Sequence, residues 1–281
     1  MKLVRLICTA WVLAASTASA REVVEAKLPR STEGASAAIR GLVDAAPQPN
    51  GRALLVFPGW PGIPRIEVQD GRPTFLYLQQ HVQDMRHILH AAGISIVTVD
   101  CPTDQWGARG FTPTACDDRY RSSEQHAQDV SALIDRIRET QGFKSFYVMG
   151  HSYGAVSSHW LAIRLGEALS GSIHSATQSV PGGGAFTQYA YSVADIKPSQ
   201  LPKTSIYLHH RDDLCRFTPY DYAQKQAVNG LMTVVGGNRW AEPCGKASFH
   251  SYAGRSTQVG QALVKWMNEG IITAVIKGAD D

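Results

Sequence analysis

The 281-residue sequence lacks both a long hydrophobic run and a concentrated basic segment. The apolar stretch near its start, residues 6–15, is too short to span a bilayer. Lysine and arginine are scattered among acidic residues, whereas a nucleic-acid-binding protein needs a clustered positive footprint. The sequence therefore predicts neither a membrane span nor a nucleic-acid partner.

The first twenty residues have the pattern of a secretory signal. Lys2 and Arg5 precede the apolar stretch, and the small residues 18–20 provide a cleavage site. We expect cleavage after Ala20, which would release residues 21–281 as a periplasmic or secreted protein. Loss of two of the 27 basic residues would leave 25 against 24 acidic ones, a net charge of about +1.

Cysteines are few, and their number is even once Cys8 leaves with the signal. The remaining four are Cys101, Cys116, Cys215 and Cys244. An even number of cysteines in an exported protein favours disulfides, although four buried thiols remain the alternative. Of the three possible connectivities, 101 with 116 and 215 with 244 close the shorter loops, each worth about 3 kcal/mol.

Apolar runs alternate with segments of helical periodicity along the chain. Residues 53–57 and 94–99 read as strands buried on both faces, and apolar residues from Leu76 to Leu89 recur at helical spacing between them. Further strands are expected over 22–28, 37–43, 145–149, 172–175, 204–209 and, last, 231–235, and further helices over 127–137, 155–165 and 259–267. The pattern predicts an α/β fold: one domain, 21–281, whose mostly parallel central sheet has helices on both faces.

The segment Gly150–Gly154 has the form G-x-S-x-G and lies between a predicted strand and a predicted helix. Such a strand-to-helix turn needs Gly150 and Gly154 because no side chain fits there, and it lifts Ser152 above the sheet edge as a candidate nucleophile. The Tyr153 amide would face a developing oxyanion. His151 is expected to line the turn without taking part in proton transfer. The alternative is a chance glycine-serine turn.

A serine nucleophile needs a base and an acid, and candidates follow in the chain order Ser, Asp, His. Asp212 and Asp213 both lie just past the predicted strand 204–209, where sites of parallel sheets form. His250 lies between the last predicted strand and the closing helix. A bridge between residues 215 and 244 would join the acid loop to the segment before His250, and His210 would support the acid loop.

Residues 57–62 form a glycine- and proline-rich loop after a predicted strand. Its Trp60 amide is the candidate second donor of an oxyanion hole, the alternative being a tight turn packed by Trp60. His87 and His90 are three residues apart on a predicted helix, but no third ligand is evident, so no metal site is predicted.

Over most of residues 35–270 the sequence resembles the α/β-hydrolase-fold serine hydrolases. The matching pieces are residues 57–62, 99–100, 150–154, 209–213 and His250. The sequence is also similar to a little-described bacterial subgroup with a His-His-x-x-Asp-x-Cys acid loop and a later cysteine before the histidine. The resemblance favours Asp213 as the acid. It departs from the family where Pro58-Gly59 replaces the frequent His-Gly, and it lacks a His-Gly-Gly-Gly motif.

The resemblance implies esterase, thioesterase, lactonase or peptidase chemistry and no cofactor. We expect an exported serine hydrolase that cleaves a small ester-like bond of a small molecule through an acyl-enzyme, with Ser152, His250 and Asp213 as its triad. A peptidase, or a non-catalytic ligand-binding protein on the same fold, is the alternative. The aromatic residues Phe186, Tyr189, Tyr191, Trp60 and Tyr153 would wall an open pocket or pack an insertion that is too short for a large cap domain.

Overall fold

The computed structural model describes residues 21–32, 34–106, 116–180, 193–238, 240 and 242–279. Within them one sheet of nine strands has the order β1 (Glu22–Thr32), β2 (Ala35–Asp44), β6 (Ile94–Val99), β3 (Arg52–Phe57), β7 (Ser145–His151), β8 (Gly171–Ser175), β9 (Ser205–His210), β10 (Leu231–Val234) and β11 (Val275–Ile276). β1 and β2 form an antiparallel hairpin, and β2 is antiparallel to β6. All other neighbouring pairs are parallel, so the sheet is mostly parallel, as predicted.

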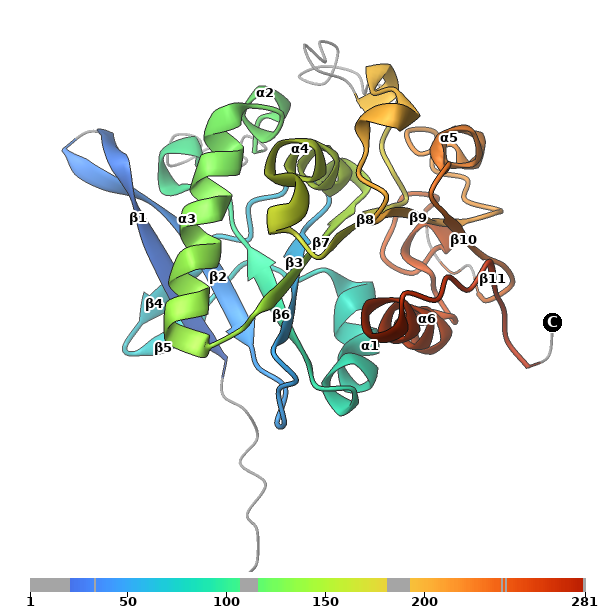
Figure 1. Cartoon of the computed structure of the whole chain (residues 1–281), viewed down its shortest axis with the longest axis horizontal. Coiled ribbons are helices and arrows are strands. Elements are labelled where there is room, and N and C mark those ends of the chain that lie inside the picture. Colours follow the sequence, from blue (N-terminus) through green and yellow to red (C-terminus); the bar gives the residue numbers. More distant parts are fainter. Residues whose placement is uncertain are drawn as a thin grey trace, which may run out of the picture.

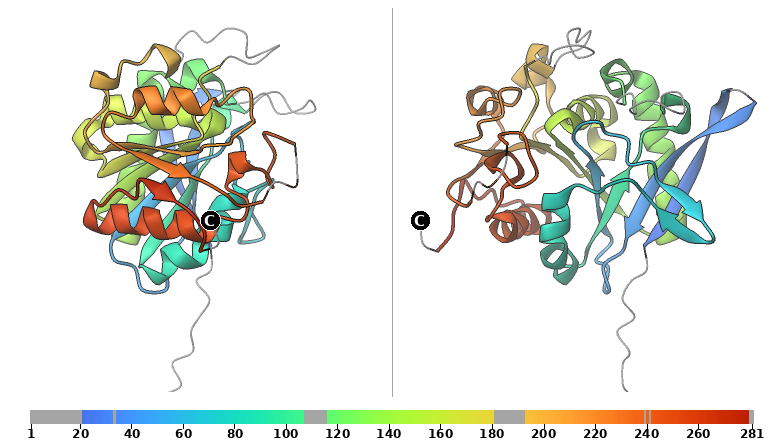
Figure 2. Two further views of the ribbon diagram at one scale, coloured as in Figure 1. Left: turned by 90° about the vertical axis from the view of Figure 1, so that its right-hand side faces the viewer. Right: turned by 180° about the vertical axis from the view of Figure 1, so that it is seen from behind.

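Helices cover both faces of this sheet (Figures 1 and 2). One face carries α2 (Asp118–Arg121), α3 (Glu124–Gln141), α4 (Ala155–Leu165) and α5 (Tyr220–Gln226), and the other carries α1 (Gln80–Ala91) and α6 (Ser256–Glu269). The strand β3 shows why the central strands read as continuous apolar runs. Its residues 53, 55 and 57 pack in the core beneath α3, whereas residues 54 and 56 pack beneath α1 and α6.

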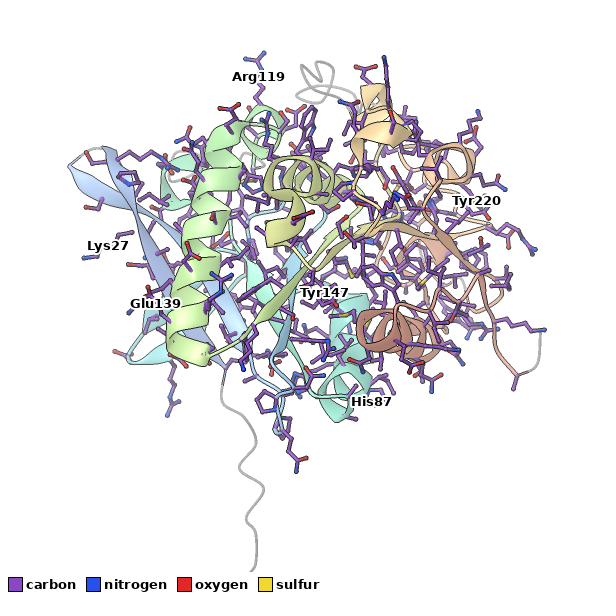
Figure 3. All side chains as sticks on the ribbon, in the orientation of Figure 1. Lys27, His87, Arg119, Glu139, Tyr147 and Tyr220 are labelled. Carbon is purple, nitrogen blue, oxygen red and sulfur yellow. A yellow bond between two sulfur atoms is a disulfide. The ribbon has the colours of Figure 1, made fainter. Side chains whose placement is uncertain are left out.

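The helix α3 illustrates how local sequence sets an element and its orientation. Its first turn is capped by Ser123, whose side chain accepts a hydrogen bond from the His126 amide, and it ends at Gly142 with a left-handed φ of 70°. Apolar residues at helical spacing between Val130 and Ile137 face the sheet. The opposite side of the helix is polar, and Figure 3 shows Glu139 projecting from it, as Lys27 does from β1 and His87 from α1.

Two sequence expectations about elements are wrong in their bounds. The helix expected from Leu76 begins only at Gln80, because Leu76 lies exposed in a loop, where its amide donates to the Pro64 carbonyl, and Leu78 lines a cavity. The strand at 231–235 is not the last, because β11 pairs in parallel with β10 after α6. The small hairpin of β4 (Glu67–Gln69) and β5 (Arg72–Thr74) is too short to show a periodicity and was not expected.

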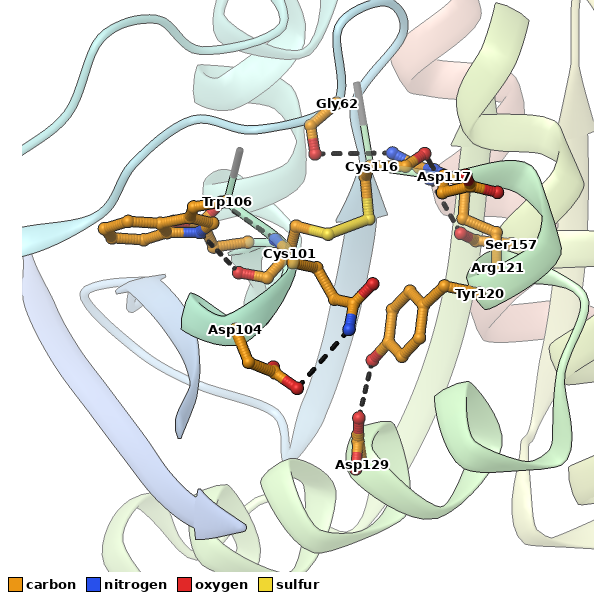
Figure 4. The surroundings of a disulfide bond; sticks show 12 residues. Gly62, Cys101, Asp104, Trp106, Cys116, Asp117, Tyr120, Arg121, Asp129 and Ser157 are labelled. Atoms are coloured by element: carbon orange, nitrogen blue, oxygen red, sulfur yellow. Dashed lines mark hydrogen bonds between the residues drawn. A yellow bond between two sulfur atoms is a disulfide. The ribbon is translucent and has the colours of Figure 1, made fainter. Parts of the chain in front are cut away.

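Two disulfides have the pairing that the cysteine spacing favoured. Cys101 is joined to Cys116, and Cys215 to Cys244, across sequence separations of 15 and 29 residues. Figure 4 shows the first bridge next to α2, whose Arg121 side chain is buried and donates to the Cys116 carbonyl and the Ser157 hydroxyl. The predicted signal, residues 1–20, lies outside the described residues.

Candidate active site

The turn around Ser152 lies at the carboxyl end of β7, where the strand passes into a 3-10 turn (Ser152–Gly154) and then into α4. Ser152 has a φ of 54°, a left-handed conformation that is uncommon for any residue except glycine. A Cβ on Gly150 would lie 2.2 Å from the Gly154 carbonyl oxygen, and one on Gly154 would lie 2.0 Å from the Phe57 carbonyl oxygen. Neither glycine tolerates a side chain, as expected from the sequence.

The side chains of Asp213 and His250 meet although 37 residues separate them in the chain. The Nδ1 atom of His250 lies 2.9 Å from Oδ2 of Asp213. The Asp213 side chain is fully buried, whereas that of Asp212 is half exposed and lies beside Arg211. The structure therefore places Asp213, and not Asp212, against His250.

Asp213 has three further hydrogen-bonding partners. The Thr218 hydroxyl and the Cys215 amide donate to its two oxygens at 2.8 and 2.9 Å, and His209 Nε2 lies 3.3 Å from Oδ2. Burial alone would raise the pKa of Asp213, but the hydrogen bonds from His209 and His250 outweigh it and hold that pKa well below its usual range. Asp213 is therefore an anion at neutral pH.

An ionised Asp213 determines which nitrogen of His250 carries the proton. A carboxylate only accepts, so Nδ1 of His250 is the donor and Nε2 of the neutral ring is an acceptor. The neighbouring His210 holds the acid loop in a similar way, because its Nδ1 accepts from the Asp212 amide and its Nε2 donates to the Gly236 carbonyl. His210 thus supports the acid loop, as expected.

Ser152 and His250 line one cavity of about 510 Å³. The described residues that line it are Gly59, Trp60, Tyr77, Leu78, Gln79, Gln80, His151, Ser152, Gln178, Cys215, Arg216, Phe217, Cys244, Lys246, His250 and Ser251. They come from the loops at the carboxyl ends of β3, β7, β8 and β9 and from the segment before α6. Sites of parallel α/β sheets form at this edge.

The loop after β3 lies directly against the nucleophile turn. A Cβ on Gly59 would lie 3.4 Å from the Ser152 Cβ, and the Gly59 amide donates to the Gln79 side chain at 3.0 Å. The Gly59 amide is thus engaged by Gln79, and the oxyanion role of the Trp60 amide stays a prediction. The Trp60 ring is half exposed and packs edge-on against Tyr153.

The aromatic wall expected from the sequence is only partly present. Trp60 lines the cavity, but the Tyr153 side chain is buried away from it and donates its hydroxyl to the Cys116 carbonyl. The cavity is lined instead by Tyr77 and Phe217, which the sequence did not suggest. Phe186, Tyr189 and Tyr191 lie outside the described residues.

Buried histidines surround the candidate triad. His151 is completely buried, lies between the rings of His81 and His250, and hydrogen bonds to the Ser175 hydroxyl through Nδ1. Burial lowers its pKa well below the usual range, and the neighbouring histidines lower it further, so it is neutral. The sequence did not indicate His81, and although His209 belongs to the acid-loop motif, its contact with Asp213 was not expected, because no local pattern shows which side chains meet in space.

No group of three or more His, Cys, Asp or Glu side chains is arranged to hold a metal ion in the described ranges. His87 is exposed on α1, while His90 is buried and contacts the Asp44 backbone carbonyl. None of the helices formed by the described residues is both long and apolar enough to cross a membrane.

Comparisons with known proteins identify the fold. No family model and no curated protein matches the sequence. Among solved structures, Est1E from Butyrivibrio proteoclasticus aligns with a TM-score of 0.56 at 13% identity, covering 89% of this chain and 98% of its own. An alpha/beta hydrolase fold protein from Nakamurella multipartita aligns with a TM-score of 0.55 at 13% identity, covering 89% and 100%.

A thermostable carboxyl esterase from Bacillus coagulans aligns with a TM-score of 0.51 at 11% identity, over 89% of this chain and 99% of its own. At such identities the likeness concerns the fold and not the reaction. The alignments extend over nearly the whole of this mostly parallel sheet with helices on both faces. The chain therefore has the α/β-hydrolase fold.

Proposed function

We propose that the protein is a serine hydrolase that cleaves a small ester-like bond, a carboxylester, thioester or lactone, through an acyl-enzyme. The observation that carries the proposal is the buried Asp213–His250 pair, at 2.9 Å, beside the same cavity as Ser152. Burying an ionised carboxylate such as Asp213 is costly, and holding Ser152 at a left-handed φ is costly as well. Their occurrence together supports a catalytic role.

In the proposed reaction the Ser152 hydroxyl oxygen attacks the substrate carbonyl while His250 Nε2 takes its proton. The tetrahedral intermediate carries an oxyanion, to which the amides of Trp60 and Tyr153 donate. When the intermediate collapses, the bond to the leaving group breaks, and that group takes the proton from His250. Asp213 keeps Nδ1 protonated throughout and stabilises the imidazolium.

Water then repeats the sequence on the acyl-enzyme. His250 takes a proton from the water, whose oxygen attacks the acyl carbonyl, and returns the proton to Ser152 as the acid product leaves. The mechanism needs no redox partner or metal, because the chain supplies nucleophile, base and oxyanion donors. A cavity of about 510 Å³ suits a small-molecule substrate.

The direct test is labelling of the purified protein by a fluorophosphonate, which phosphonylates activated serines. We expect the wild type to be labelled and Ser152→Ala not to be. Ser251→Ala is the matched control, because Ser251 lines the same cavity but donates to the Gly245 carbonyl, and it should remain labelled.

A panel of esters, thioesters, lactones and amides would then identify the bond type. Turnover of the amides alone would replace the ester proposal with a peptidase. An unlabelled wild type that turns over nothing in the panel would favour the non-catalytic binding protein.

We also propose that the protein is exported and acts outside the cytoplasm. Two disulfides support this location, because disulfides persist in oxidising compartments. Sequencing of the mature amino terminus after expression in a bacterial host should begin at Arg21. An amino terminus at Met1 on a protein that stays with the cytoplasmic fraction would contradict the proposal.

A further inference from the structure

The described residues that line the cavity beside Ser152 include two cationic side chains and no acidic one. Arg216 and Lys246 both line it, together with the neutral amides of Gln79, Gln80 and Gln178. No aspartate or glutamate is among its described lining residues. A cleft with one sign of charge concentrates ligands of the opposite sign.

Both cations come from backbone segments that a disulfide holds together. Arg216 directly follows Cys215, and Lys246 is two residues beyond Cys244. The Cα atoms of these two cysteines are 4.7 Å apart. The bridge that joins the Asp213 loop to the segment before His250 thus also brings the two cations to the same part of the cavity wall.

Arg216 is oriented by its neighbour in the chain. Its guanidinium carbon lies 4.7 Å from the centre of the Phe217 ring, and Phe217 also lines the cavity. A guanidinium that stacks on a ring through its face keeps the N–H groups at its edge available to a planar anion such as a carboxylate.

Neither cation is neutralised by a carboxylate in the part of the chain that the structure describes. Arg30 and Arg86 differ in this respect, because each donates two hydrogen bonds to one aspartate side chain. Those two arginines hold elements of the fold together through their aspartate partners. Arg216 and Lys246 instead lie exposed at the cavity, where a ligand can reach them.

From these observations we infer that the substrate of Ser152 carries an anionic group, such as a carboxylate, apart from its scissile ester, and that Arg216 and Lys246 bind this group. The inference rests on the proposed function and names the substrate class of the same site. The ester would bind with its reacting carbonyl at Ser152 and its anionic group at the wall formed by the two disulfide-linked segments.

The test compares esters that differ only in charge. Mono-4-nitrophenyl adipate carries a carboxylate on the acyl side, and its methyl ester is the neutral partner. The pair 4-acetoxybenzoate and methyl 4-acetoxybenzoate places the charge on the leaving group. In at least one pair we expect the anionic member to have a kcat/KM about tenfold higher, the scale of two partly exposed ion pairs. This preference should shrink as salt is added.

The double variant Arg216→Gln, Lys246→Gln should bring the anionic-to-neutral ratio of kcat/KM close to 1. The matched control is Arg72→Gln, Lys203→Gln, which removes the same charge from two exposed positions that do not line the cavity. The control should keep the preference of the wild type. A preference that is absent in the wild type, or that survives in the double variant, would overturn the inference.

A binding measurement makes the test independent of turnover. Calorimetric titration of Ser152→Ala with mono-4-nitrophenyl adipate and with its methyl ester should give about tenfold tighter binding of the anion. Equal affinities there would also overturn the inference. Failure of the proposed function is distinguishable, because it would appear as a wild type that the fluorophosphonate does not label, whatever the charge of the ester.

Discussion

Two buried carboxyl side chains, Asp100 and Asp213, occupy similar positions in the fold, but their pKa values are shifted in opposite directions. Each lies just past the carboxyl end of a strand of the central sheet and within two residues of a disulfide cysteine, Cys101 in one case and Cys215 in the other. Burial raises the pKa of Asp100 to about 7, although the amides of Ile66 and Cys101 donate to it. The pKa of Asp213 is held well below its usual range, because histidines add hydrogen bonds that outweigh burial.

The difference shows that a carboxyl group buried at the end of a strand is not for that reason ionised, as the acid of a catalytic triad must be. Burial outweighs the backbone amides that donate to Asp100, so its pKa lies near 7 and the side chain is partly protonated at neutral pH; it links the end of β6 to the loop at Ile66. The two histidines at Asp213 keep it ionised, as a triad acid must be. The partners of a carboxylate, and not its depth, separate the two regions.

Replacement of each acid by its amide should give the largest difference. Asp213→Asn should lower kcat/KM by about 10⁴, because the amide no longer selects the His250 tautomer that accepts the Ser152 proton. Asp212→Asn, at a half-exposed position beside Arg211, should stay close to the wild type. Steady-state kinetics on the best ester of the panel measures both. A severe loss in Asp212→Asn with a mild one in Asp213→Asn would reverse the assignment of the acid.

The pH dependence of stability should differ between the two acids. The folded-state pKa of Asp100 is raised to about 7, above an unfolded value of about 3.9, so folding takes up a proton between these pH values and stability falls as pH rises through them. The full contribution is of the order of 4 kcal/mol. Asp213 has a depressed pKa, so its contribution is present above about pH 4 and is lost only in more acidic solution.

Urea unfolding of the wild type and of Asp100→Asn between pH 4 and 8 would measure the first of these contributions. We expect the wild type to lose stability relative to the variant up to about pH 7 and to change little above it. A constant difference across this range would show that Asp100 is ionised in the folded protein and that the contrast with Asp213 is one of degree only.

Removal of either disulfide should lower the free energy of unfolding to a similar extent, but the two removals should differ in their effect on kcat. Replacing either pair of cysteines by alanine should cost about 3 kcal/mol in free energy of unfolding, since loops of 15 and 29 residues differ by only about 0.6 kcal/mol in closure entropy. Removal of Cys215–Cys244 should in addition lower kcat by about 10²-fold, because it releases both the acid loop and the segment before His250. Removal of Cys101–Cys116 should affect kcat less. Denaturation curves and kinetics of the two double variants would make the comparison, and equal losses of kcat would contradict it.

The smallest expected effect is a difference in the order of reduction. Cys244 is exposed, whereas Cys101 and Cys116 are both buried. Under mild dithiothreitol, Cys215–Cys244 should therefore open first, because exchange requires access to a sulfur atom. Alkylation at successive times followed by peptide mapping would follow both bonds, and earlier alkylation at Cys116 would contradict the prediction.

The local parts of the site were predictable, but the contacts between them were not. The pattern of Gly150–Gly154 indicates a strand-to-helix turn because its glycines follow from backbone crowding within a few residues. The sequence also suggested Asp213 and His250, through chain order and family resemblance. It did not indicate that His209 and Thr218 also bond Asp213, or that Gln79 engages the Gly59 amide, because these contacts depend on how separate loops meet.

By itself the sequence determined the alternation of strands and helices, the four cysteines beyond residue 20 and the chain order of serine, acid and histidine. These features follow from periodicity, composition and local turn chemistry, which act over short stretches of chain. Only the tertiary structure decided that Asp213 is buried against His250 while Asp212 is exposed, and that Tyr153 packs beneath the site while Phe217 lines it. Burial and hydrogen-bond partners are properties of the packed molecule, because the loops that create them come from strands far apart in the sequence.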